Sequence, residues 1–281
     1  MSDVKQLQSY LACPRCDKTP LSFDDGVFAC GACKIEFPDI GGMPWMFADP
    51  DASLGEWRNR LQFAIQQLGH EISSLDQELK DDTLRPLTRR RVERFRKSTD
   101  LHRRALQKLL KPVDIQSFSG NYESYLALRT RLPSDQGLNT YYANIHRDWS
   151  WGDEENKASL KQVRAVLHEN AELGDVLVLG AGACRLAYDI HKELDCTRVV
   201  AMDFNPLLML VAQAMAAGKQ LKMYEFPIAP PSLEDDVVMR RLSAPEVAGE
   251  GFHLVVVGIG IDTLAACDDR SQEIGHDHLG D

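Results

Sequence analysis

The segment Gly174–Pro206, GDVLVLGAGACRLAYDIHKELDCTRVVAMDFNP, decides the expected architecture. Its apolar run Val176–Leu179 is typical of a strand that is buried on both faces of a parallel sheet. The glycine turn Gly180-Ala181-Gly182 follows, where the backbone can turn sharply and approach a ligand closely. Apolar residues then recur at helical spacing from Cys184 to Leu194. We therefore expect a strand, a glycine turn and a helix in that order.

A second predicted strand, Arg198–Met202, ends in Asp203, and Pro206 suits the first turn of a following helix. This order is half of a nucleotide-binding βαβ unit, in which the acid receives ribose hydroxyls. Arg185 stands where a dinucleotide fingerprint has its third glycine. S-adenosylmethionine has no pyrophosphate and does not need that glycine, so the pattern favours it over NAD. A glycine turn without a ligand remains a third interpretation.

Length and composition indicate a soluble globular protein. The chain has 281 residues, 44% of them hydrophobic and 26% charged, which is enough for two domains. No apolar run approaches the roughly 18–20 residues that span a bilayer, and the N-terminus lacks a signal-peptide core. We expect a cytoplasmic protein without a membrane partner. The net charge of −10 argues against general nucleic-acid binding but leaves room for a local basic face.

Two CxxC pairs near the N-terminus predict a metal site. Cys13 and Cys16 are separated from Cys30 and Cys33 by 13 residues that have a hairpin pattern. Two such knuckles place four thiolates at the corners of a tetrahedron, which suits Zn²⁺ without an open coordination position. We expect a structural site and assign these cysteines no catalysis.

This region resembles a short zinc-ribbon domain. That domain occurs as a small free-standing bacterial protein and as the activator subunit of RNA and protein methyltransferases. The matching residues are Leu11-Ala12-Cys13-Pro14-x-Cys16, Cys30-x-x-Cys33, Phe37-Pro38 and Gly42-Met43-Pro44. The resemblance implies a scaffold that packs on a methyltransferase.

Two long amphipathic helices are predicted next, over Leu54–Lys80 and Leu84–Lys111. The second contains eleven Lys and Arg residues, from Arg85 to Lys111, against only Glu93 and Asp100. It could dock RNA or an acidic protein, or it could be a solvated face that balances an acidic remainder. The expected domains are a zinc ribbon at 1–50, a helical region at 51–135 and a Rossmann-like domain at 136–281.

A second resemblance rests on two motifs. Arg147-Asp148-Trp149-Ser150, followed by a helix and then Gly180-Ala181-Gly182-x-x-Arg185-Leu186-Ala187, is similar to the carnosine N-methyltransferase-like family of class I S-adenosylmethionine-dependent methyltransferases. The similarity covers roughly residues 139–230. It implies an α/β, Rossmann-like class I methyltransferase fold.

The same resemblance implies a set of cofactor-binding residues. Arg147 and Asn144, the latter replacing the family's glutamine, would hold the methionine carboxylate. The Gly180-Ala181-Gly182 turn would pass under the methionine and ribose, and Asp203 would bind the ribose hydroxyls. From the residues alone, a salt bridge at Arg147 and a buried Trp149 are also expected. The methyl acceptor is not specified: a nitrogen of a small molecule, an RNA base or a protein side chain all fit.

The C-terminal end departs from the family. Phe252–Val257 predicts a third strand, whereas a class I fold needs about seven, and the acidic tail after Gly258 shows little periodicity. We expect a truncated chain with an incomplete fold, although a minimal sheet or pairing with another chain remains open. The competing function is therefore a non-catalytic zinc-ribbon scaffold.

Overall fold

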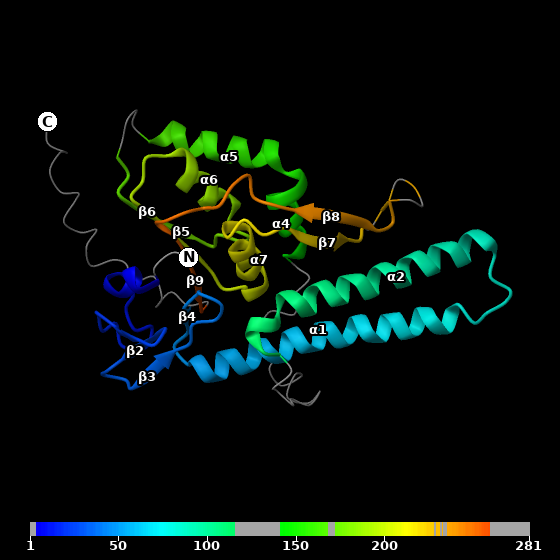
Figure 1. Cartoon of the computed structure of the whole chain (residues 1–281), viewed down its shortest axis with the longest axis horizontal. Helices are drawn as coiled ribbons and strands as arrows, with labels where there is room; N and C mark the ends of the chain where they lie inside the picture. Colours follow the sequence, from blue (N-terminus) through cyan, green and yellow to red (C-terminus); the bar gives the residue numbers. More distant parts are fainter. Residues whose placement is uncertain are drawn as a thin grey trace, which may run out of the picture.

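A computed structural model describes residues 4–115, 141–167, 172–227, 229–230, 232 and 235–258. The expected domain boundary near residue 135 and the tail after Gly258 lie outside these ranges. Within them the chain forms a small N-terminal ribbon, a long helical hairpin and a mixed α/β body (Figure 1). No helix of these ranges combines the length and apolar character that crossing a bilayer requires.

The ribbon begins with the short 3-10 helix η1 (Val4–Ser9) and continues with three antiparallel strands in the order β1-β2-β3. These strands are β1 (Ser22–Asp24), β2 (Val27–Cys30) and β3 (Ile35–Phe37). The β1–β2 turn, Asp25-Gly26, has positive φ at both residues (46° and 82°), as a two-residue hairpin turn needs. The predicted hairpin between the cysteine pairs is confirmed.

The α/β body is built on a four-stranded parallel sheet in the order β4-β9-β6-β5. Its strands are β4 (Trp45–Met46), β9 (Phe252–Val257), β6 (Arg198–Asp203) and β5 (Asp175–Leu179). The three strands predicted from the second half of the chain are confirmed. The fourth comes from the end of the ribbon, where Trp45 pairs with Val256 and Met46 with Val257. The ribbon is therefore joined to the body by shared strand hydrogen bonding.

The prediction that the first strand is buried on both faces is wrong. Strand β5 forms the edge of the sheet, and Leu177 and Leu179 remain 39% and 50% exposed. Val176 and Val178, which face the other way, are partly buried against the core. Among the described residues no strand pairs with the outer edge of β5. The adjacent β6, paired on both sides, shows the burial that its apolar sequence predicts.

Different parts of the chain cover the two faces of the sheet. One face, including Val199 and Ala201, belongs to the main core with the helices α5 (Asp153–Val166), α6 (Arg185–Glu193) and α7 (Pro206–Ala216). The opposite face packs on the ribbon. The residues of this second core include Val200, Met202 and Val255 from the sheet and Leu21, Phe28 and Phe37 from the ribbon. A structural ribbon therefore shields part of a sheet face from water.

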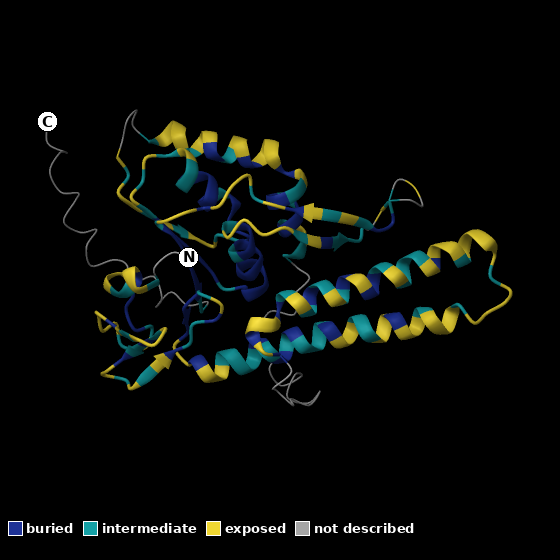
Figure 2. Cartoon of the chain, viewed as in Figure 1, coloured by how far each residue is buried: buried dark blue, intermediate teal, exposed yellow. Residues whose placement is uncertain are grey.

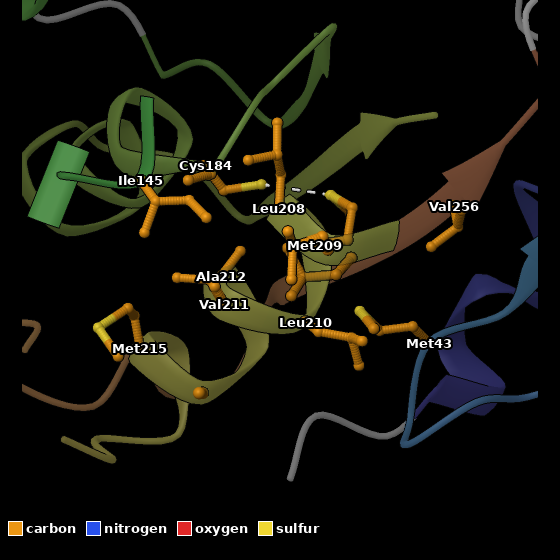
Figure 3. Close-up of a cluster of buried hydrophobic side chains, with 14 of the residues drawn as sticks. Met43, Ile145, Cys184, Leu208, Met209, Leu210, Val211, Ala212, Met215 and Val256 are labelled. Atoms are coloured by element: carbon orange, nitrogen blue, oxygen red, sulfur yellow. Dashed lines mark hydrogen bonds between the residues drawn. The ribbon is translucent and has the colours of Figure 1, made fainter. Parts of the chain in front are cut away.

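Helix α7 is almost completely buried (Figures 2 and 3). Its sequence is apolar on all sides because it has neighbours on all sides, including Met43 from the ribbon end and Ile145. The side chain of Asn205 caps its start by accepting a hydrogen bond from the backbone N–H of Leu207 at 3.0 Å. The first-turn position of Pro206 is confirmed.

The helical hairpin consists of α1 (Pro50–Glu78) and α2 (Pro86–Leu109), which extend side by side away from the body (Figure 1). Arg96 and Asp76 form an ion pair at 2.8 Å that links the two helices. The antiparallel strands β7 (Leu221–Glu225) and β8 (Val238–Leu242) make a separate hairpin, and β7 contacts α2.

Two buried histidines lie where α2 meets the body. His102 of α2 and His146 of the short helix α4 (Tyr142–His146) are 6% and 0% exposed, and both contact the ring of Tyr142. Burial, with a smaller contribution from His146, lowers the pKa of His102 to about 4. Burial also lowers the pKa of His146, against an opposing effect of Glu225. Both imidazoles are therefore neutral in the fold at pH 7.

Acidification is expected to destabilise the protein through His102. An unfolded histidine has a pKa of about 6.5, so between that pH and the folded pKa near 4 the unfolded chain binds more protons. The free energy of unfolding therefore decreases as the pH is lowered. The decrease from His102 alone is about 1 kcal/mol between pH 7 and pH 5.5. Urea titrations should show this loss reduced in His102→Phe and retained in His70→Phe, which alters an exposed histidine of α1. If the unfolding free energy of wild type and of His102→Phe depends on pH in the same way, His102 is not the source of the acid destabilisation.

Candidate functional site: a four-cysteine cluster and a glycine loop

The four N-terminal cysteines form one compact cluster. Their Sγ atoms all lie within 4.8 Å of one another, with 4.0 Å between Cys13 and Cys33 and 3.6 Å between Cys16 and Cys30. Four thiolates around a tetrahedral zinc, each about 2.3 Å from the metal, lie about 3.8 Å apart. The cluster therefore has the ligand type, number and spacing of a closed metal site such as a structural zinc site.

The two CxxC turns share one backbone arrangement. The residues just after the pairs, Asp17 and Lys34, have φ of 59° and 55° and donate their N–H to the carbonyls of Cys13 and Cys30 at 2.9 and 2.8 Å. The backbone N–H of Cys33 also points at the Cys30 sulfur, 3.4 Å away, and lowers the pKa of that thiol to about 7, whereas burial raises the pKa of Cys13 and the contact with the Cys16 thiol raises that of Cys33. Such N–H contacts favour the thiolate, which is the form that binds metal.

A second cluster surrounds the glycine loop between β5 and α6. Gly180 and Gly182 both have φ of +61°, a conformation that an L side chain adopts only with strain. A Cβ atom added at either residue would meet no heavy atom within 4 Å. Ala181 between them ties the loop to β6 by donating its N–H to the Met202 carbonyl at 2.9 Å. The loop therefore needs glycine for its backbone, and space is open beside it.

Asp203, at the carboxyl end of β6, lies against this loop. Its Oδ2 accepts the N–H of Gly182 at 2.8 Å, and its Oδ1 accepts the N–H of Asn205 at 2.8 Å. The residue is 5% exposed, and burial raises the pKa of its carboxyl group although backbone N–H groups oppose the shift. The predicted acid and the predicted glycine turn are thus in direct contact at adjacent strand ends.

The Arg147–Ser150 motif forms the next part of the cluster. It lies in η3 (Arg147–Trp151), a single π-helical turn that follows α4. Trp149 is 4% exposed and donates its indole N–H to the Ala183 carbonyl at 2.8 Å, which fastens η3 to the glycine loop. The burial of Trp149 expected from the residues is confirmed.

The two residues expected to hold a carboxylate lie on either side of the α4–η3 junction. The guanidinium of Arg147 is paired with Asp148, whose Oδ1 it contacts at 2.9 and 2.7 Å, and the Arg147 side chain is 35% exposed. The salt bridge predicted from the residues is therefore present. Asn144 is half-buried on α4. The cofactor contacts expected of both residues remain predictions.

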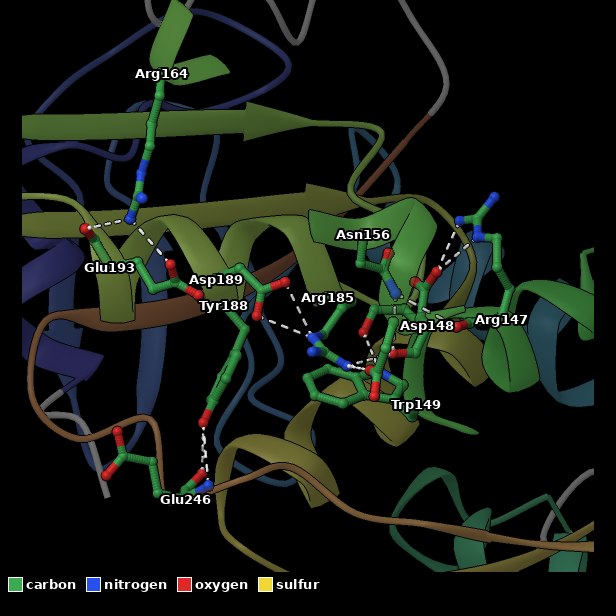
Figure 4. A network of polar contacts seen from close by, with 12 residues as sticks. Arg147, Asp148, Trp149, Asn156, Arg164, Arg185, Tyr188, Asp189, Glu193 and Glu246 are labelled. Atoms are coloured by element: carbon green, nitrogen blue, oxygen red, sulfur yellow. Dashed lines mark hydrogen bonds and ion pairs between the residues drawn. The ribbon is translucent and has the colours of Figure 1, made fainter. Parts of the chain in front are cut away.

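Arg185 has a structural role that its sequence motif did not predict (Figure 4). Its side chain is buried, pairs through Nε with both carboxylate oxygens of Asp189 at 2.9 and 3.1 Å, and donates through Nη1 to the Asp148 carbonyl at 3.0 Å. It also reaches Asp153 at 3.0 Å and lies over the Trp149 ring. The i,i+4 spacing of Arg185 and Asp189 was the available signal. This network holds α6, η3 and α5 together around the loop.

Comparison with known proteins adds no family assignment. The chain matches no protein-family model and no curated protein. What the structure establishes is a cluster of four cysteines suited to a metal, and an α/β body whose parallel sheet places a glycine loop against a buried acid.

Proposed function

We propose that the chain binds S-adenosylmethionine at the glycine loop and transfers its methyl group to a nitrogen acceptor, with a structural Zn²⁺ in the ribbon. The observation that carries the proposal is the contact between Asp203 and Gly182 at the ends of two adjacent parallel strands. Ligands of open α/β sheets bind at the carboxyl ends of the strands. The open space beside Gly180 and Gly182 leaves room for one.

Each residue has a separate role in the proposed site. Asp203 would accept ribose hydroxyls with the lone pairs that its two backbone contacts leave free. The glycines let the cofactor approach the backbone, and Arg147 would hold the methionine carboxylate. The cofactor supplies an activated methyl group. The remaining requirement is alignment of the acceptor with that methyl group, which is a matter of positioning and needs at most a weak base.

Asp203→Ala is expected to weaken S-adenosylmethionine binding by about ten- to hundredfold, because hydrogen bonds to a charged group contribute about 1.5–3 kcal/mol. Isothermal calorimetry on the zinc-loaded chain measures this. Asp195→Ala, which removes an exposed acid in the loop before β6, is the matched control and should bind as wild type does. Affinity in Asp203→Ala equal to that of Asp195→Ala would contradict the assignment.

Because Asp203 is buried and its loss could disturb the loop, Arg147→Gln provides a second variant. The Arg147 side chain is 35% exposed but pairs with the buried Asp148, so urea unfolding must accompany the binding measurement to show that the variant keeps its fold. It should weaken S-adenosylmethionine binding but not that of 5′-methylthioadenosine, which lacks the amino-acid carboxylate. A parallel loss for both ligands would assign Arg147 a structural role only.

A non-catalytic scaffold is the second candidate. It is favoured by β5, which the methyltransferase proposal would place inside a larger sheet but which, among the described residues, forms an edge with Leu177 and Leu179 exposed. Under this proposal the ribbon and the helical hairpin dock a partner and the glycine loop is inert. Absence of cofactor binding by a folded, zinc-loaded chain would support it.

A further inference from the structure

Most basic residues of α2 fall into two groups. The first group contacts other elements of the chain. Arg96 pairs with Asp76 of α1, and Arg89 donates to the backbone carbonyls of Leu79 and Asp81 at the hairpin tip. Arg91 and Arg94 both approach Asp236, ahead of β8, at 3.4 and 3.5 Å. These side chains close the helical hairpin and attach it to the body.

The second group forms a row on the opposite side of the helix. Arg90, Lys97 and Arg104 are seven residues apart, and Lys111 continues the same interval just after α2, in the short turn η2 (Lys111–Val113). All four are exposed. The inward-facing residues of α2 repeat in the same way and include Val92, Phe95, Thr99, His102 and Leu106. In a heptad with Val92 at position a, these inward-facing residues occupy positions a and d. The basic row occupies position f, which lies on the opposite side of the helix.

Little negative charge lies along the basic row. Seven helical residues rise about 10.5 Å and drift about 20° around the helix, so the three row members on α2 span about 21 Å. Of the two acids on α2, Asp100 is 9% exposed and already contacts Arg103 and Arg104, which leaves Glu93 beside the row. The Arg104 side chain is still 69% exposed. A chain with a net charge of −10 therefore presents one long positive edge.

We propose that the basic row binds the phosphate backbone of a duplex nucleic acid. A rigid row of single charges at regular intervals matches a polymer whose charge is also regular, and such contacts bind without reading sequence. No aromatic side chain of α2 is exposed, so this surface lacks the stacking groups that a single-strand binder uses. The arms of the test separate RNA from DNA, which share this chemistry. The proposal does not depend on methyl transfer.

The test uses the full zinc-loaded chain and fluorescence anisotropy with a labelled 20-base-pair RNA duplex, a DNA duplex of the same sequence, and polyglutamate as an acidic competitor. The row variant carries Arg90→Gln, Lys97→Gln, Arg104→Gln and Lys111→Gln. The matched control carries Lys157→Gln, Lys161→Gln, Lys219→Gln and Lys222→Gln, which remove the same charge from exposed positions elsewhere.

Wild type and control should bind a duplex with a steep salt dependence. The logarithm of the binding constant should fall against the logarithm of the salt concentration with a slope of about −3.6 if four phosphates are neutralised on B-form DNA. The row variant should bind at least tenfold more weakly with a slope near zero, while its S-adenosylmethionine affinity is unchanged. No duplex binding by wild type, or equal losses in both variants, would overturn the proposal. Displacement by polyglutamate at equal charge concentration would assign the row to an acidic protein instead.

Discussion

Zinc removal is expected to unfold the ribbon and uncover the sheet face beneath it. The Cys13→Ser substitution takes one of four ligands from a cluster whose sulfurs have tetrahedral spacing. Structural zinc contributes about 10–16 kcal/mol of apparent binding free energy in zinc-finger peptides at pH 7, which exceeds what so small a ribbon gains from its core. Val255, now fully buried, and Met202 would then face water.

Metal analysis should find one zinc per chain in the wild type and a sharp decrease in Cys13→Ser. Hydrogen exchange should show lost protection in β1–β3 and in the β4 pairing with β9, whereas α5 stays protected. Cys196→Ser, which alters a thiol outside the cluster, is the control and should keep its zinc. Protection of β1–β3 that survives complete chelation would show that the ribbon folds without metal.

The Arg185→Met substitution is expected to cost about 3–5 kcal/mol of unfolding free energy, because it leaves the Asp189 carboxylate buried without its partner. Burial already raises the pKa of Asp189, and Arg185 opposes that shift. Without the guanidinium the carboxyl group becomes still harder to ionise. The loss measured by urea unfolding should therefore be largest near neutral pH and smaller in acid.

Two comparison variants separate the buried pair from surface effects. Arg164→Met breaks an ion pair with Glu193 in which both side chains are about half exposed, and it should cost less than about 1 kcal/mol. The double variant Arg185→Met/Asp189→Leu removes both buried charges and should recover much of the loss. If Arg185→Met costs no more than Arg164→Met, the network does not anchor the glycine loop.

Local patterns predicted the parts of the fold whose interactions are local. The Asp25-Gly26 hairpin and the order of strand, glycine turn and helix up to Asp203 follow from turn chemistry and periodicity over a few residues. The pairing of β4 with β9 joins segments about 200 residues apart, and no pattern within either segment specifies it. The exposure of Leu177 likewise depends on which strand, if any, lies beyond β5.

The candidate site also combines residues that local motifs predict with a residue whose position depends on tertiary packing. The cysteine spacing and Asp203 were found from motifs, because their chemistry is carried by residue type at a fixed interval. The position of Arg185 between α6 and η3 depends on tertiary packing that brings Trp149 against the loop, and its sequence signal was only an acid one helical turn away.

The most direct test of the cofactor site is calorimetric titration of the zinc-loaded chain with S-adenosylmethionine, with NAD as the comparison ligand. The site predicts micromolar binding of S-adenosylmethionine and much weaker binding of NAD, since Arg185 stands in place of the third glycine of a dinucleotide-binding fingerprint. A folded, zinc-loaded chain that binds neither ligand, or that prefers NAD, would contradict it.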